Sequence, residues 1–260
     1  MKALLDHLSS EDKIRILQGL EGLADRLPDL DGPDFEEAVH GIISLFYLDP
    51  MDHPELVPVL EQAEHLLADQ RTRAIPAILD ALAESDLKVH FHLAAALGRM
   101  GHAAVEPLLC AYREAEEPYV RIFALYALGK VKDPKVIRAV PALFEALEDP
   151  HPELRDTAAR ALGKLVEHLD PNAIPYDLRR ELFRRLHDKV RDRFAGVRSK
   201  AVRSLGKMAR FGLLERDEAE AATVTLAGIL GEGEGESWDL AYIVRLEAQR
   251  ARRHLSVPPR

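Results

Sequence analysis

The sequence predicts an all-α fold, a solenoid of stacked helical pairs. A ten-residue pattern recurs along the chain, and residues 120–129 (VRIFALYALG) are its clearest copy. Further copies begin at Val89, Leu154 and Val197, and a worn copy begins at Val244. A pattern that recurs at this spacing indicates an array in which neighbouring units share one continuous core.

Prolines give a second, independent sign of the repeat. Pro76, Pro107 and Pro141 each precede the last glycine of a copy by 22 residues. Proline is tolerated in the first turn of a helix, where its missing N–H has no partner to lose. Each proline therefore predicts the start of the first helix of a pair. Short acidic or proline-containing turns separate the two helices of each pair, at 84–86, 116–118 and 149–152.

The N-terminal part of the chain, residues 1–70, lacks the pattern. Three segments between helix breakers, 11–27, 35–47 and 55–69, predict helices, and the first carries apolar residues at three- and four-residue spacing. A solenoid needs an atypical end repeat to cover its open core. We therefore interpret 1–70 as an N-terminal helical cap with degenerate repeats. With the array at 71–260 it forms one continuous solenoid of five or six helical pairs.

Individual positions of the pattern predict how repeats pack. Positions 1, 5 and 9 share one helical face, and alanine at position 5 allows close helix packing. The glycine at position 10 costs roughly 0.5–1 kcal/mol inside a helix, so its recurrence predicts a contact that leaves no room for a side chain. Position 2 is predicted to pair with an acidic turn residue of the adjacent unit. Its occupants are His90, Arg121, Arg155, Arg198 and Arg245.

The pattern Val-Arg-x-x-Ala-x-x-Ala-Leu-Gly resembles a HEAT repeat, in the short bacterial form called the PBS-lyase-like HEAT repeat. The resemblance covers residues 75–210 well and 217–255 less closely. It implies a right-handed α-α superhelix (a HEAT-repeat solenoid) whose second helices line a concave surface. HEAT arrays serve as scaffolds, transport factors, chromophore lyases, a hydroxylase and DNA glycosylases, so the resemblance implies a fold rather than an activity.

Basic residues recur at positions 4 and 7 of the pattern and at position 11, directly after its glycine. These positions lie together on one face of the second helix. They predict a basic stripe on the concave surface that would bind an acidic peptide or protein partner, or else a merely solvated face. Phe123 and Tyr126 add an aromatic anchor typical of protein interfaces. The candidate partner-binding residues are Arg99, Phe123, Tyr126, Lys130, Arg160, Lys164, Lys200, Arg203, Lys207, Arg210 and Arg250.

The charge distribution suggests an alternative. Residues 176–210 hold twelve Lys or Arg against four Asp or Glu, whereas residues 1–70 hold four against sixteen. The basic region could bind nucleic acid through phosphates. The chain's net charge of −9 and its aromatic content of 6% make this the weaker hypothesis, because nonspecific binders are basic and single-strand binders need stacking platforms.

Other chemistries find little support. The chain has no His-Glu dipeptide, the pair through which the HEAT hydroxylases bind iron, and no His-Glu-x-x-His motif. Its single tryptophan, Trp238, is interpreted as packing in a terminal cap rather than as a glycosylase residue. The segment 231–236 alternates glycine with glutamate and lacks the lysine of a phosphate-binding loop. We therefore predict no catalytic residue, no cofactor and no metal.

The bulk properties complete the prediction. No apolar run approaches the roughly 18 residues that span a bilayer, and the first residues do not form a signal peptide. The single cysteine, Cys110, excludes an internal disulfide and is expected to be a buried, inert thiol in a reducing compartment. The sequence thus predicts a cytoplasmic, non-catalytic scaffold or adaptor that binds a protein partner and has no membrane association.

Overall fold

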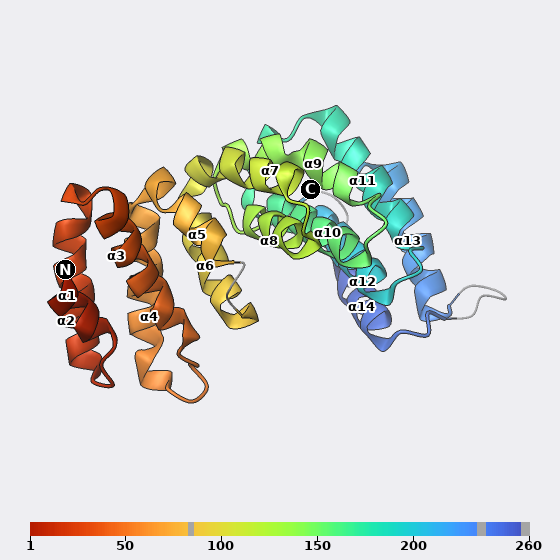
Figure 1. Ribbon diagram of the computed structural model, residues 1–260. Helices are drawn as coiled ribbons and strands as arrows, with labels where there is room; N and C mark the ends of the chain where they lie inside the picture. The colour runs from red at the N-terminus through yellow and green to blue at the C-terminus, as the bar shows by residue number, and fades with distance from the viewer. Residues whose placement is uncertain (83–85, 233–237, 256–260) are drawn as a thin grey trace. The chain divides into compact units, whose positions relative to one another are not determined.

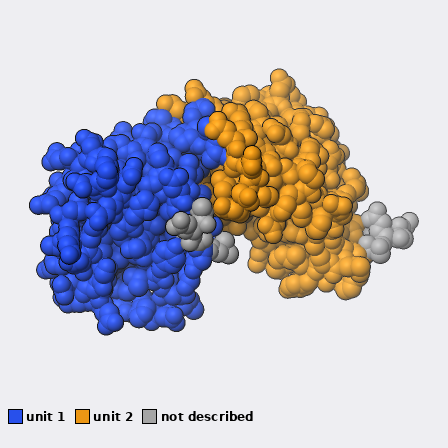
Figure 2. All heavy atoms as spheres, viewed as in Figure 1, with its two compact units in different colours: residues 1–111 blue, residues 112–260 orange. Residues whose placement is uncertain are grey.

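The computed structural model describes residues 1–82, 86–232 and 238–255, and over these residues it contains helices and turns but no strand (Figure 1). Most of the predicted turn at 84–86 and of the acidic segment 231–236 lies outside the described residues. The chain divides into two compact units, residues 1–111 and 112–260, coloured blue and orange in Figure 2. The division at residue 70 expected from the sequence stays a prediction.

Unit 1 is a stack of helical pairs in two layers. Helices α2, α4 and α6 contact one another in turn, and so do α1, α3 and α5. The bounds are α1 (Lys2–Leu8), α2 (Lys13–Arg26), α3 (Gly32–Ser44), α4 (Val57–Asp69), α5 (Ile75–Ala81) and α6 (Leu87–Arg99).

Unit 2 repeats this arrangement. Helices α8, α10, α12 and α14 pack side by side and form its second-helix layer, while α9, α11 and α13 pair with α10, α12 and α14 (Figure 1). The bounds are α7 (Val105–Glu114), which crosses the unit boundary, α8 (Pro118–Leu128), α9 (Val140–Ala146), α10 (Pro152–His168), α11 (Tyr176–Lys189), α12 (Ala195–Arg210), α13 (Arg216–Leu230) and α14 (Tyr242–Leu255).

The all-helical repeat architecture is confirmed, with two differences in detail. The three helices expected within 1–70 are present as α2, α3 and α4, the last two extended by 3₁₀ turns at Leu45–Tyr47 and Pro54–Leu56. The described residues contain seven helical pairs rather than five or six. The sequence prediction missed α1, because seven residues without the pattern give little periodic signal.

The glycine at position 10 marks the closest approach of neighbouring second helices, as predicted. A Cβ atom on Gly129 would lie 3.2 Å from Ala161 Cα, and one on Gly206 would lie 2.9 Å from Ala251 Cα. On Gly163 it would lie 2.1 Å from Ser204 Oγ. The partner is each time the small residue at position 8 of the next copy. These contacts set the spacing of the α8–α10–α12–α14 layer.

Three of the five position-2 residues, Arg121, Arg155 and Arg198, pair with an aspartate in the turn of the following repeat, as predicted. Arg155 donates through Nε and Nη2 to both oxygens of Asp192, at 2.7 and 3.0 Å, and Arg198 binds Asp239 in the same way at 2.7 and 2.8 Å. Arg121 donates to Asp149 at 2.9 Å. We call this series of pairs the arginine ladder.

Each arginine–aspartate pair, a rung of the ladder, is held by further hydrogen bonds to the backbone, as the Arg155–Asp192 pair shows. The remaining nitrogen, Nη1, of Arg155 donates to the backbone carbonyls of Asp149 and Pro150 in its own turn. Asp192 in turn accepts from the backbone N–H of Phe194 at 2.9 Å. Burial raises the pKa of Asp192, but the Arg155 and Phe194 hydrogen bonds outweigh burial, and the net pKa is lowered. The carboxylate is therefore held in its charged form, locking one repeat onto the next.

Two single-residue expectations, those for Cys110 and Trp238, are wrong. The thiol of Cys110 is exposed rather than buried, because Cys110 faces outward from α7. Trp238 is 55% exposed rather than packed into a terminal cap, and its ring lies over the Arg245 guanidinium at 4.1 Å.

Candidate interaction site

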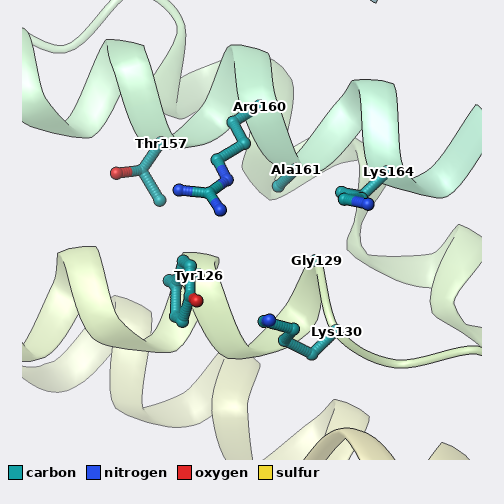
Figure 3. A pocket seen from close by; sticks show the side chains of 7 residues that line it. All are labelled: Tyr126, Gly129, Lys130, Thr157, Arg160, Ala161 and Lys164. Carbon is teal, nitrogen blue, oxygen red and sulfur yellow. The ribbon is translucent and has the colours of Figure 1, made fainter. Parts of the chain in front are cut away.

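A cluster of cations surrounds one aromatic ring between α8 and α10 (Figure 3). The guanidinium carbon of Arg160 lies 5.0 Å from the ring centroid of Tyr126, and Lys130 Nζ lies 5.3 Å from it. Figure 3 shows both cations directed into the space between the two helices, with Lys164 and Thr157 beside them. We call Tyr126, Lys130, Thr157, Arg160 and Lys164 the α8–α10 cluster.

Small residues form the floor of this cluster. Gly129 and Ala161, which make the close approach of α8 to α10, line it together with the five side chains. The enclosed space is about 10 Å³, which suffices for about one water molecule. The cluster therefore cannot enclose a small-molecule ligand, but it can receive the end of a single side chain.

Most of the other predicted cations are neutralised. Lys164 and Lys207 share Glu167, each at 2.9 Å, Arg203 and Arg250 share Glu247, and Lys200 lies 3.6 Å from Asp156. Arg99, in unit 1, donates to Glu64.

Lys130 and Arg160 differ from these residues, because within the described ranges neither has an ion pair. Arg210 likewise lies against a ring, that of Phe211, at 5.5 Å. Burial raises the pKa of Asp156, and the positive charges of Lys200 and Arg160 oppose this effect, but the carboxylate of Asp156 forms its ion pair with Lys200 rather than with Arg160. The predicted stripe is thus mostly a network of ion pairs, with unpaired positive charge at the α8–α10 cluster.

Phe123 must be removed from the candidate surface, since it is 4% exposed. Position 4 lies at the border between repeats rather than on an open face. Lys200 of α12 pairs with Asp156 of α10, and Glu247 of α14 pairs with Arg203 of α12. Thr157, also at position 4, was missed, although it lies three residues before Arg160 on the same helical face.

The basic region 176–210 loses most of its surplus charge in the fold. Acidic side chains from outside the region reach its cations, so the local excess does not become an open positive surface. These pairs join Arg180 with Asp217 and Glu218, Lys189 with Glu148, Arg198 with Asp239, Lys200 with Asp156, Arg203 with Glu247, and Lys207 with Glu167. This arrangement weakens the nucleic-acid hypothesis.

Glu167 lies beside the cluster and forms ion pairs with two lysines, Lys164 and Lys207. The Lys164 hydrogen bond lowers its pKa to about 2 against the opposing effect of burial, and Lys207 adds to the lowering. The unfolded chain would titrate this group near 4.5. The stability that it contributes is therefore fully present above pH 4.5 and is lost as the pH falls toward 2.

We expect Glu167→Gln to lower the free energy of unfolding at neutral pH by about 1 kcal/mol, because partial exposure screens the two ion pairs. The difference from the wild type should shrink below pH 4.5 and vanish only below about pH 2, where the wild-type carboxylate is largely protonated as well. Urea denaturation across this pH range measures it. A difference that stays constant with pH would show that Glu167 does not act through its charge.

Within the described residues, no helix is both long and apolar enough to cross a bilayer.

A search of curated proteins found no match to this chain.

Solved structures share the fold at low sequence identity. One chain in the structure of the complex of CpcE and CpcF of phycocyanin lyase from Nostoc sp. PCC7120 is 22% identical to this chain, with a TM-score of 0.56. The match covers 69% of this chain and 98% of that chain. An engineered protein is 19% identical, with a TM-score of 0.52, over 97% and 94%. A designed armadillo repeat protein is 16% identical, with a TM-score of 0.53, over 91% and 100%.

The family model of HEAT repeats matches residues 75–140, 105–176 and 140–236, which together make up more than half of the chain. The matched ranges contain the position-10 glycines and the Arg121, Arg155 and Arg198 rungs of the ladder. The chain therefore belongs to the HEAT repeat family.

Proposed function

We propose that this protein is a non-catalytic scaffold that binds an acidic segment of a protein partner on the second-helix layer of unit 2. One observation carries the proposal. The cations of the α8–α10 cluster that flank Tyr126 have no carboxylate partner among the described residues, whereas six other cations of the predicted stripe do.

The composition of the cluster favours binding of an anion. Lys130 and Arg160 repel each other across the Tyr126 ring, and an incoming carboxylate would relieve this repulsion. The guanidinium of Arg160 matches the planar geometry of a carboxylate. The ring itself offers apolar area beside the charges, as at protein interfaces. The limited space fits one acidic side chain of a peptide that lies across the helices.

The cluster offers no machinery for catalysis. Its side chains are three cations, one phenol and one hydroxyl, and they include no carboxylate, imidazole or thiol to serve as a general base or nucleophile. Likewise, no group of three or more potential metal ligands occurs among the residues that the structure describes.

Anisotropy of a fluorescein-labelled, glutamate-rich peptide tests the proposal. We expect binding that weakens with salt. The double variant Lys130→Glu/Arg160→Glu should lower the affinity at least about tenfold, equivalent to 1.4 kcal/mol, because it replaces attraction by repulsion. The variant Lys132→Glu/Arg216→Glu changes two exposed cations outside the cluster by the same total charge, and it should bind like the wild type.

Three further ligands complete the experiment: a lysine-rich peptide of the same length, duplex DNA and RNA. None of them should bind as tightly as the acidic peptide. Equal weakening in both double variants would indicate a general charge effect rather than a site. Tighter binding of DNA or RNA than of the acidic peptide would replace the proposal by the nucleic-acid hypothesis.

A further inference from the structure

The last position-2 arginine of the ladder is one for which the described residues supply no carboxylate. Arg245 occupies position 2 of the worn copy, near the start of α14. Its Nη1 donates to the backbone carbonyl of Asp239 at 2.5 Å, as Nη1 of Arg155 does to Asp149 and Nη1 of Arg198 does to Asp192. The three guanidinium groups are therefore anchored in the same way, each to its own turn.

The opposite edge of the guanidinium differs. In Arg155 and Arg198 this edge, Nε and Nη2, is held by both oxygens of an aspartate from the following repeat. Arg245 has no ion pair with any described residue. The nearby carboxylate of Asp239 is already held by Arg198. Arg245 thus presents a positioned two-nitrogen edge of the kind that a turn aspartate binds in Arg155 and Arg198.

Exposed aromatic and apolar side chains surround this edge. The Trp238 ring lies 4.1 Å from the guanidinium carbon and the Tyr242 ring lies 5.9 Å from it, and these side chains are 55% and 68% exposed. Leu240, midway between them in the sequence, is 88% exposed. Trp, Tyr and Arg dominate the residues that carry binding energy at protein interfaces. An internal rung has a similar composition, since Phe194 lies over Arg155 at 5.4 Å.

We propose that Arg245, Trp238 and Tyr242 bind an aspartate or glutamate side chain presented by a turn of a partner protein. The internal rungs show the chemistry of the occupant, because the same edge in Arg155 and Arg198 binds a turn aspartate bidentately. A planar guanidinium fork favours a carboxylate over a neutral amide. This site at the turn end of the last repeat stands independently of the α8–α10 cluster.

Trp238 is the only tryptophan of the chain, so intrinsic fluorescence reports on this site directly. The probe is a synthetic peptide that copies residues 188–197, the turn whose Asp192 fills the Arg155 rung and which contains no tryptophan. We expect a saturable change in Trp238 emission. The same peptide with Asn at the position of Asp192 should bind at least about tenfold more weakly, since it loses the charge-assisted hydrogen bonds to Arg245.

Variants assign the response. Arg245→Gln should abolish binding of the labelled peptide in an anisotropy assay, and Arg245→Lys should restore little, because a single ammonium lacks the fork. Circular dichroism checks that both variants fold. Lys130→Glu/Arg160→Glu should leave this binding unchanged, which separates the site from the α8–α10 cluster.

Three results would overturn the assignment. One is an equal response to the Asp and Asn peptides, and another is no response to either. The third is self-association of the wild type that Arg245→Gln removes, because the site would then serve a second copy of the chain rather than another protein.

Discussion

Asp192→Asn is expected to lower the free energy of unfolding by about 3–5 kcal/mol, one of the largest effects available in this chain. Arg155 and Asp192 are both buried, with side chains 8% and 7% exposed. The substitution keeps the shape of the side chain but leaves the guanidinium buried without a counter-charge, which is costly. Urea denaturation followed by circular dichroism measures the loss.

A control separates burial from ion pairing in general. Asp217→Asn removes a partner of Arg180, which also lies in the preceding repeat, but those side chains are 67% and 40% exposed. Exposed pairs contribute about 0–1 kcal/mol, so this variant should stay near the wild type. The double variant Arg155→Leu/Asp192→Leu should cost less than Asp192→Asn, because it leaves no buried charge. If Asp192→Asn costs no more than Asp217→Asn, the ladder does not hold the repeats together.

Both contacts that define this stack, the ladder and the glycine contacts, were predictable from the sequence. Gly129, Gly163 and Gly206 recur at a helix position where glycine is costly, so each copy argues independently for close packing. The ladder was predictable because Arg155 and Arg198 recur while acidic residues recur in the turns. A repeat supplies several copies of one environment, and one pattern then stands for many contacts.

The candidate site was less predictable, because its electrostatics depend on residues that do not follow the pattern. Glu167 lies after the ten-residue signature and Glu247 replaces a variable residue, yet they neutralise Lys207 and Arg203 of neighbouring helices. Only the register of one helix against the next shows which cations have a carboxylate partner and which do not. Phe123 illustrates the same limit, since a helical wheel does not reveal that position 4 borders the adjacent repeat.

Gly206→Ala is expected to destabilise the protein by about 1–3 kcal/mol, the cost of overpacking a tight contact. In an unconstrained helix the same change would stabilise by roughly 0.5–1 kcal/mol. The new methyl group would lie 2.9 Å from Ala251 Cα, a backbone atom that moves only if α12 and α14 separate. Chemical denaturation of the variant decides between the two signs.

Gly163→Ala provides a comparison that tests the cause. Its methyl group would lie 2.1 Å from Ser204 Oγ and 2.9 Å from Ser204 Cβ, so Ser204→Gly removes both clashes. In a double-mutant cycle Ser204→Gly should therefore reduce the cost of Gly163→Ala. Ala251→Gly should relieve Gly206→Ala much less, because the Cα atom remains. Stabilisation by either alanine alone would show that these helices can separate freely, and the glycines would then need another explanation.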